Sequence, residues 1–164
     1  MFKNSHSVHI ALLYYNINNY YKGVTMKNSI GKINLGVGLL IMAGFMAYGF
    51  VLIYMRDFHP DKEAWIAASN MGMHFETRLA HVHGNLFSLL NIVFGYLLLT
   101  LPISAKYAKI VSTFALLGIL MPLGILAEAY LGLPYYLVLV GAISIIIATI
   151  TLAIGVLAMK KEQN

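Results

Sequence analysis

The chain has 164 residues, of which 60% are hydrophobic and only 10% charged, whereas a soluble globular domain carries about 25% charged residues. It contains no cysteine, which excludes disulfides, thiolate metal sites and iron–sulfur clusters. Its net charge is +5, but its lysines flank apolar stretches instead of forming the basic, aromatic-interleaved patch that binds nucleic acid. These features predict an all-α integral membrane protein that has the lipid bilayer as its partner and binds no nucleic acid.

Residues 1–25 differ from the rest of the chain. They are rich in Asn and Tyr, show no clear period and lack the compact apolar stretch of a secretory signal. Codons for Lys22-Gly23-Val24 can spell a bacterial ribosome-binding sequence shortly before the codon for Met26. Two interpretations stay open: a leader preceding a true start at Met26, or a disordered cytoplasmic tail. Residues 26–164 then form a single transmembrane domain.

Four apolar stretches are long enough to cross a bilayer as helices, which takes roughly 20 residues. They are residues 33–54, 79–101, 107–131 and 135–159. Pro102 and the turn Gly132-Leu133-Pro134 end the second and third stretches, so the last three helices are joined by short connections. The long connection covers about residues 55–75. The sequence therefore predicts an antiparallel four-helix bundle.

The basic residues predict the orientation of the bundle. Eight of the 11 are expected on one side of the membrane: Lys3, Lys22, Lys27, Lys32, Lys106, Lys109, Lys160 and Lys161. The other three, Arg56, Lys62 and Arg78, are expected on the opposite side. Because positive residues favour the cytoplasmic side, both termini should be cytoplasmic and the long connection external. We expect a multi-pass protein of the cytoplasmic (inner) membrane.

Small and weakly polar residues predict the packing faces of the helices. In the second span the expected buried stripe is His81, Gly84 or Asn85, Ser88, Asn91 and Gly95, and the expected lipid-facing stripe is His83, Phe87, Leu90, Phe94 and Leu97. The expected packing residues of the first span are Gly36, Ala43, Ala47 and Tyr48. Those of the third span are Gly118, Met121, Gly124 and Glu128, and those of the fourth are Gly141, Ser144, Ala148, Thr151 and Gly155.

Ionisable residues at the external end of the second span form the candidate site. At about 1.5 Å of rise per residue, His81 and Glu128 lie at the same level. Ionisable groups inside a span are functional candidates by default. We expect His81 to be a haem or metal ligand, with Glu128 fixing its tautomer and Arg78 holding an anionic group such as a propionate. His83 points about 200° away from His81, so the two cannot bind one ion. His74 shares the face of His81 but lies about 10 Å from it along the axis.

Each residue also has a purely structural interpretation. His81 could only hydrogen-bond Glu128 or a backbone carbonyl and so close the bundle. His83 could be an interfacial side chain. His74 and Arg78 could belong to a solvated helix start.

The run Ala80-His81-Val82-His83-Gly84-Asn85-Leu86-Phe87-Ser88-Leu89-Leu90, followed by Gly95, resembles the histidine-bearing second helix of haem–copper oxidase subunit I. It is similar above all to small bacterial four-helix membrane proteins described as oxidase-subunit-I-like. The resemblance implies that His81 or His83 is an axial haem ligand, with haem b or a metal ion as cofactor. The other spans contain no histidine, so a second ligand would come from another subunit, Met121 or water, and an oxygen-reducing copper–haem centre cannot be assembled.

Three functions stay open. The first is a haem or metal protein acting in electron transfer, gas sensing or as a respiratory accessory, alone, as a homo-oligomer or in a respiratory membrane complex. The second is a non-catalytic structural or assembly subunit. The third is a proton or small-solute pathway through His81 and Glu128. Since the sequence has no nucleophile–base pair, phosphate loop or paired carboxylates, we do not expect an enzyme.

Overall fold

A computed structural model describes the backbone of residues 3–159 and the side chains of residues 12–19, 21 and 29–159. Lys160 and Lys161 lie outside the described residues, as do the side chains of Lys3, Lys22 and Lys27. All regular structure in the described part is helical, in the order α1 (Lys3–Asp57), α2 (Lys62–Ala67), α3 (Gly72–Thr100), α4 (Ala105–Gly118), α5 (Leu120–Leu131) and α6 (Tyr136–Leu157).

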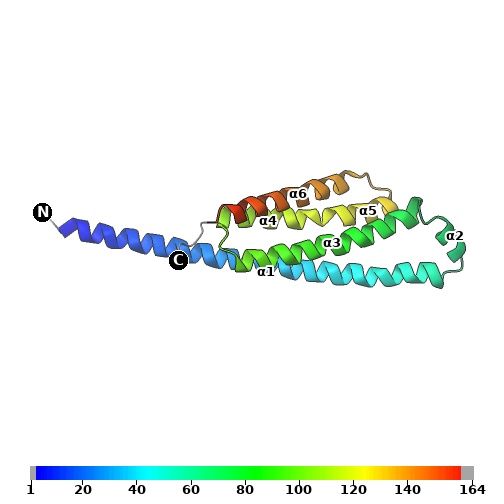
Figure 1. The fold of residues 1–164 in the computed structure, drawn as a ribbon, viewed down its shortest axis with the longest axis horizontal. Helices are drawn as coiled ribbons and strands as arrows, with labels where there is room; N and C mark the ends of the chain where they lie inside the picture. Colours follow the sequence, from blue (N-terminus) through cyan, green and yellow to red (C-terminus); the bar gives the residue numbers. More distant parts are fainter. Residues whose placement is uncertain (1–2, 160–164) are drawn as a thin grey trace.

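The four predicted spans are confirmed. The described residues contain four helical stretches long and apolar enough to cross a membrane: Ser29–Asp57, Gly72–Thr100, Ala105–Leu131 and Tyr136–Leu157. They run up and down side by side, and the N-terminal part of α1 extends beyond them (Figure 1). The chain is a multi-pass membrane protein with an antiparallel helical bundle. The helix through residues 3–25 does not bear on whether Met26 is the true start, which stays a prediction.

One end of the bundle carries α2 and is called the loop end here. The C-terminus of α1, α2, the start of α3, the end of α5 and the start of α6 meet there (Figure 1). The predicted turn at Gly132 closes this end: Gly132 has φ +64° and its N–H bonds the carbonyl of Glu128 at 3.0 Å. Positive φ suits glycine because it has no Cβ.

The third predicted span is two helices instead of one. Helix α4 ends at Gly118 and α5 begins at Leu120. Pro122 explains the break, because it has no N–H to give the carbonyl of Gly118 and its ring crowds that carbonyl. The N–H of Ile119 instead bonds the carbonyl of Leu116 at 3.1 Å, one residue closer than in a regular α-helix.

Small residues bring α1 and α3 together. A Cβ added to Gly38 would lie 2.9 Å from the carbonyl oxygen of Ser88, and one on Gly84 would overlap the ring of Phe45. The α1 residues in this contact include Gly31, Asn34, Gly38 and Phe45. The predicted α1 face was therefore wrong at three positions: Ala43 and Ala47 are exposed, and Gly36 has open space around it.

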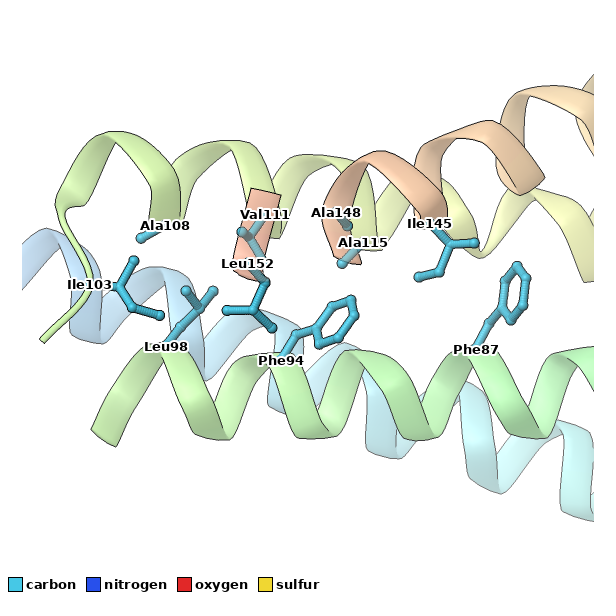
Figure 2. Packing of buried hydrophobic residues seen from close by; sticks show 10 residues of the cluster. All are labelled: Phe87, Phe94, Leu98, Ile103, Ala108, Val111, Ala115, Ile145, Ala148 and Leu152. Atoms are coloured by element: carbon cyan, nitrogen blue, oxygen red, sulfur yellow. The ribbon is translucent and has the colours of Figure 1, made fainter. Parts of the chain in front are cut away.

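The opposite face of α3 is buried too. Phe87, Phe94 and Leu98 point from α3 towards α4 and α6, where they meet Val111, Ala115, Ile145 and other apolar residues (Figure 2). The prediction that Phe87 and Phe94 face lipid was wrong, because α3 packs against α1 on one side and against α4 and α5 on the other. The exposed stripe of α3 is Val82, Leu86, Leu89, Val93 and Tyr96.

The glycine and small-residue face of α6 is as predicted. Gly141, Ser144, Ala148 and Gly155 are buried, and Thr151 is half-buried. Gly118 and Gly124 contact α6 at Ile145 and at Leu137 and Val138. These residues let α6 lie close to α4 and α5.

A buried polar cluster joins three helices. The side-chain amide of Asn34 in α1 donates to the Oδ1 of Asn91 in α3 at 3.0 Å, and the hydroxyl of Ser112 in α4 donates to the Oδ1 of Asn34. Asn91 also donates to the carbonyl of Ala115 at 2.9 Å. Asn34 was not among the predicted packing residues; an amide inside an apolar span was the signal that could have found it.

Candidate functional site

The predicted site residues lie at the loop end of the bundle. His74, Arg78, His81 and His83 occupy the first three turns of α3, and Glu128 lies near the end of α5. Helix α3 begins at a sharp turn, because its first residue, Gly72, has φ +58°. The turn folds the connection from α2 back over the first turn of α3.

His74 is buried and firmly oriented. Its ring stacks on Trp65 of α2, with centroids 4.4 Å apart and planes 16° apart, and its Nδ1 lies 2.5 Å from the carbonyl oxygen of Trp65. Since a carbonyl only accepts, Nδ1 carries the proton and the Nε2 of the neutral ring keeps a lone pair. A backbone carbonyl that holds one ring nitrogen in this way is the usual support of a metal-binding histidine.

His74 and Arg78 line the same pocket, called the Arg/His pocket here. Its volume is about 410 Å³, and Arg56 and Ser69 also line it. Arg78 donates to the carbonyl of Ser69 at 3.2 Å. Arg56 is paired with Asp57 at 2.7 Å. The structure thus brings together two of the five predicted site residues and adds Arg56.

A second pocket lies on the α2 side of His74 and has a volume of about 430 Å³. It is called the Met/His pocket, after the side chains in its lining that are able to bind a metal: Met55, Met71, Met73, His59 and His74. Asp61 and Trp65 also line it. Neither the methionines nor Trp65 was predicted as a site residue. The run Met71-Gly72-Met73-His74 was the signal in the sequence that could have found them.

His81 and Glu128, predicted to act together, are not brought together. The ring of His81 packs against α1, where a Cβ on Gly49 would lie 3.0 Å from its Cε1, and its Nδ1 is buried without a hydrogen-bond partner. The side chain of Glu128 is exposed. The expectation that Glu128 faces the seam was wrong, because matching depths along the axis says nothing about helix rotation. At this level a bond of 2.9 Å between the hydroxyls of Tyr48 and Tyr130 links α1 to α5.

His83 is half-buried and points elsewhere. Its Nδ1 donates to the carbonyl of Leu79 at 2.9 Å, and its ring meets the edge of Phe87. Neither His81 nor His83 lines the Arg/His or the Met/His pocket. Within the described part of the chain, no three His, Asp or Glu side chains are grouped closely enough to hold a metal ion. Any metal site there must therefore include other ligand types, and methionine is the remaining soft one.

No protein-family model, curated protein or solved structure matches this chain. The resemblance of residues 80–90 to the oxidase helix therefore stays a prediction.

Proposed function

We propose that this multi-pass membrane protein binds a transition-metal ion at the loop end of its bundle, with His74 as the central ligand. The observation that carries the proposal is the hydrogen bond from His74 Nδ1 to the carbonyl of Trp65, together with the stacked indole. These two contacts orient the ring and leave Nε2 as the nitrogen that can bind a metal. His83 makes a similar hydrogen bond, to the carbonyl of Leu79, but neither His83 nor His81 lines the Arg/His or the Met/His pocket.

The proposed setting is the cytoplasmic membrane, with both termini in the cytoplasm and the loop end outside. The distribution of lysine and arginine supports this orientation. The site then faces the external compartment, where it can take up an ion or exchange an electron with a soluble partner. We propose a role as an accessory of respiration or of metal handling, with a homo-oligomer or a respiratory complex as the assembly.

Haem b is the second candidate ligand. The observation that favours it is the Arg/His pocket, where Arg56 and Arg78 lie beside His74. Guanidinium groups bind carboxylates in a two-pronged geometry, so Arg78 suits a propionate of a haem, whereas Arg56 already holds Asp57 in this way. A single histidine ligand would leave the second axial position to another subunit or to water.

The test is the metal content and visible spectrum of the purified protein and its His74→Asn variant. Asparagine keeps a donor for the carbonyl of Trp65 but has no counterpart of Nε2, so the loop end should stay folded and the ligand should be lost. We expect wild type to retain close to one metal ion per chain, and the variant to lose nearly all of it. A Soret band that disappears in the variant would assign haem instead.

His81→Leu and His83→Ala are the matched controls. Both should retain the metal, and His81→Leu should keep or raise the melting temperature because it removes a buried nitrogen without a partner. Loss of metal from either control with retention in His74→Asn would overturn the assignment of the ligand. A colourless, metal-free wild type would favour the structural or assembly role.

A further inference from the structure

The Met/His pocket gathers thioether side chains in an unusual place. Three of the nine methionines, Met55, Met71 and Met73, line this one pocket at the end of the bundle. Methionine in a membrane protein usually fills gaps between packed helices. Met71 and Met73 do not: they are 67% and 47% exposed. Gap-filling inside the bundle therefore does not account for these two side chains.

The backbone places these side chains around His74. Met71, Gly72, Met73 and His74 are consecutive, and the left-handed conformation of Gly72 turns the chain between the two methionines. Met55 comes from the last turn of α1, across the pocket. Methionine has three rotatable side-chain bonds, so exposed thioethers can close on an ion between them.

Of the two imidazoles that line the pocket, one keeps a lone pair at Nε2. His74 does so because Nδ1 donates to Trp65. His59 does not, because its Nδ1 accepts the N–H of Asp61 at 3.1 Å and the proton of the neutral ring is therefore on Nε2. The ligand set is one imidazole and two or three thioethers, all uncharged. The one carboxylate in the wall, from Asp61, is a hard ligand of a different type.

We propose that the Met/His pocket is a site for monovalent copper, Cu(I), ligated by His74 and by the thioethers of Met71 and Met73, with Met55 as a further ligand. This inference rests on the proposed function, since it names the ion that the His74 site takes. Soft thioethers select Cu(I) over zinc, which prefers thiolate, imidazole and carboxylate ligands, and over hard cations such as magnesium. A neutral ligand set also suits a single positive charge better than two.

The test measures Cu(I) affinity of the detergent-purified protein by competition with a chromophoric Cu(I) chelator under anaerobic, reducing conditions. Silver(I) serves as a redox-inert soft probe and Zn(II) as the borderline one. The key variant is Met71→Leu/Met73→Leu, which conserves volume at two exposed positions and should leave the melting temperature unchanged. Met42→Leu/Met46→Leu, in the membrane span of α1, is the matched control.

We expect the Met71→Leu/Met73→Leu variant to bind Cu(I) and Ag(I) at least roughly tenfold more weakly, with Zn(II) binding unchanged and the control pair like wild type. Unchanged Cu(I) affinity in this variant, with loss in His74→Asn, would overturn the copper site and leave the proposed metal function standing. A wild type that prefers Zn(II), together with an Asp61→Asn variant that loses Zn(II) binding, would also overturn the copper site and leave the proposed metal function standing. A wild type that binds none of the three ions would overturn both proposals.

Discussion

Three histidines on the first turns of α3 differ in what surrounds their ring nitrogens. The Nδ1 of His74 donates to the carbonyl of Trp65, and its ring stacks on the indole of that residue. The Nδ1 of His83 donates to the carbonyl of Leu79 in its own helix, and the Nδ1 of His81 is buried without a partner. A backbone carbonyl orients the rings of both His74 and His83, but of these two only His74 lines the Arg/His and Met/His pockets. The unpaired buried nitrogen of His81 is a cost to folding. The surroundings, and not the residue type, distinguish a candidate ligand from a packing residue.

At the same scale, Asn91 is expected to stabilise the bundle more than any polar residue of the loop end. Asn91→Leu leaves the amide of Asn34 with only its 3.4 Å bond to the carbonyl of Ser112, and it leaves the carbonyl of Ala115 without its side-chain donor. Each stranded group costs about 1–3 kcal/mol. Thermal unfolding in detergent should show a clearly lower melting temperature. Asn85→Leu is the control, since its half-buried amide bonds only the carbonyl of His81 in its own helix; equal losses in both variants would contradict the prediction.

At the scale of elements, α3 organises the bundle. It packs on α1 through small residues and on α4, α5 and α6 through Phe87, Phe94 and Leu98. Its glycines face the helix that comes closest, and its aromatic rings fill the wider space on the other side. The break at Pro122 divides the neighbouring span into two segments, and Gly118 and Gly124, one in each, both contact α6. The site at the loop end depends on α3 because its first turn carries His74.

Gly84→Ala should therefore destabilise the α1–α3 contact. Its new methyl group would overlap the ring of Phe45, and overpacking of this kind costs about 1–3 kcal/mol. Gly44→Ala, in α1, is the matched control because nothing lies within 4 Å of its added Cβ. We expect thermal unfolding to show a loss for Gly84→Ala and none for Gly44→Ala. Adding Phe45→Leu to Gly84→Ala should restore part of the stability; failure to do so would mean that the two residues are not in contact.

At the scale of the whole molecule, charge separates the two ends of the bundle. Among residues with described side chains, Lys32, Lys106 and Lys109 lie at the end opposite the loop end, and Arg56, Lys62 and Arg78 lie at the loop end. The difference in the number of basic residues between the two ends, which predicts the orientation, therefore depends on the remaining five lysines near the two termini. A measurement of topology is the direct check.

The chain has no cysteine, so single-cysteine variants report topology without background. Lys62→Cys and Lys106→Cys both replace exposed side chains. In intact cells, a membrane-impermeant maleimide should label Lys62→Cys and spare Lys106→Cys, and both should react once the membrane is permeabilised. The reverse pattern would place the loop end, with both of its pockets, on the cytoplasmic side.

The number and approximate limits of the membrane spans were determined by the sequence alone. A bilayer of fixed thickness demands about 20 apolar helical residues, and proline and glycine mark the ends, so span and turn positions depend on local composition. The small-residue face of α6 was also predictable from the sequence, because its small residues recur at the spacing of one helical face. The break of the third span was missed although Pro122 is visible in the sequence.

The rotation of each helix about its axis was decided only by the tertiary structure. A central helix has two partners, so Phe87 and Phe94 are buried although their stripe is apolar and opposite the glycines. Glu128 faces outward although it is level with His81, because depth along the axis does not determine the rotation of α5. The candidate site moved from His81 to His74 because its pockets are built by α2 and the turn at Gly72, which bring residues from the connection over the start of α3. Such contacts join residues of different elements, and periodicity within one helix carries no information about them.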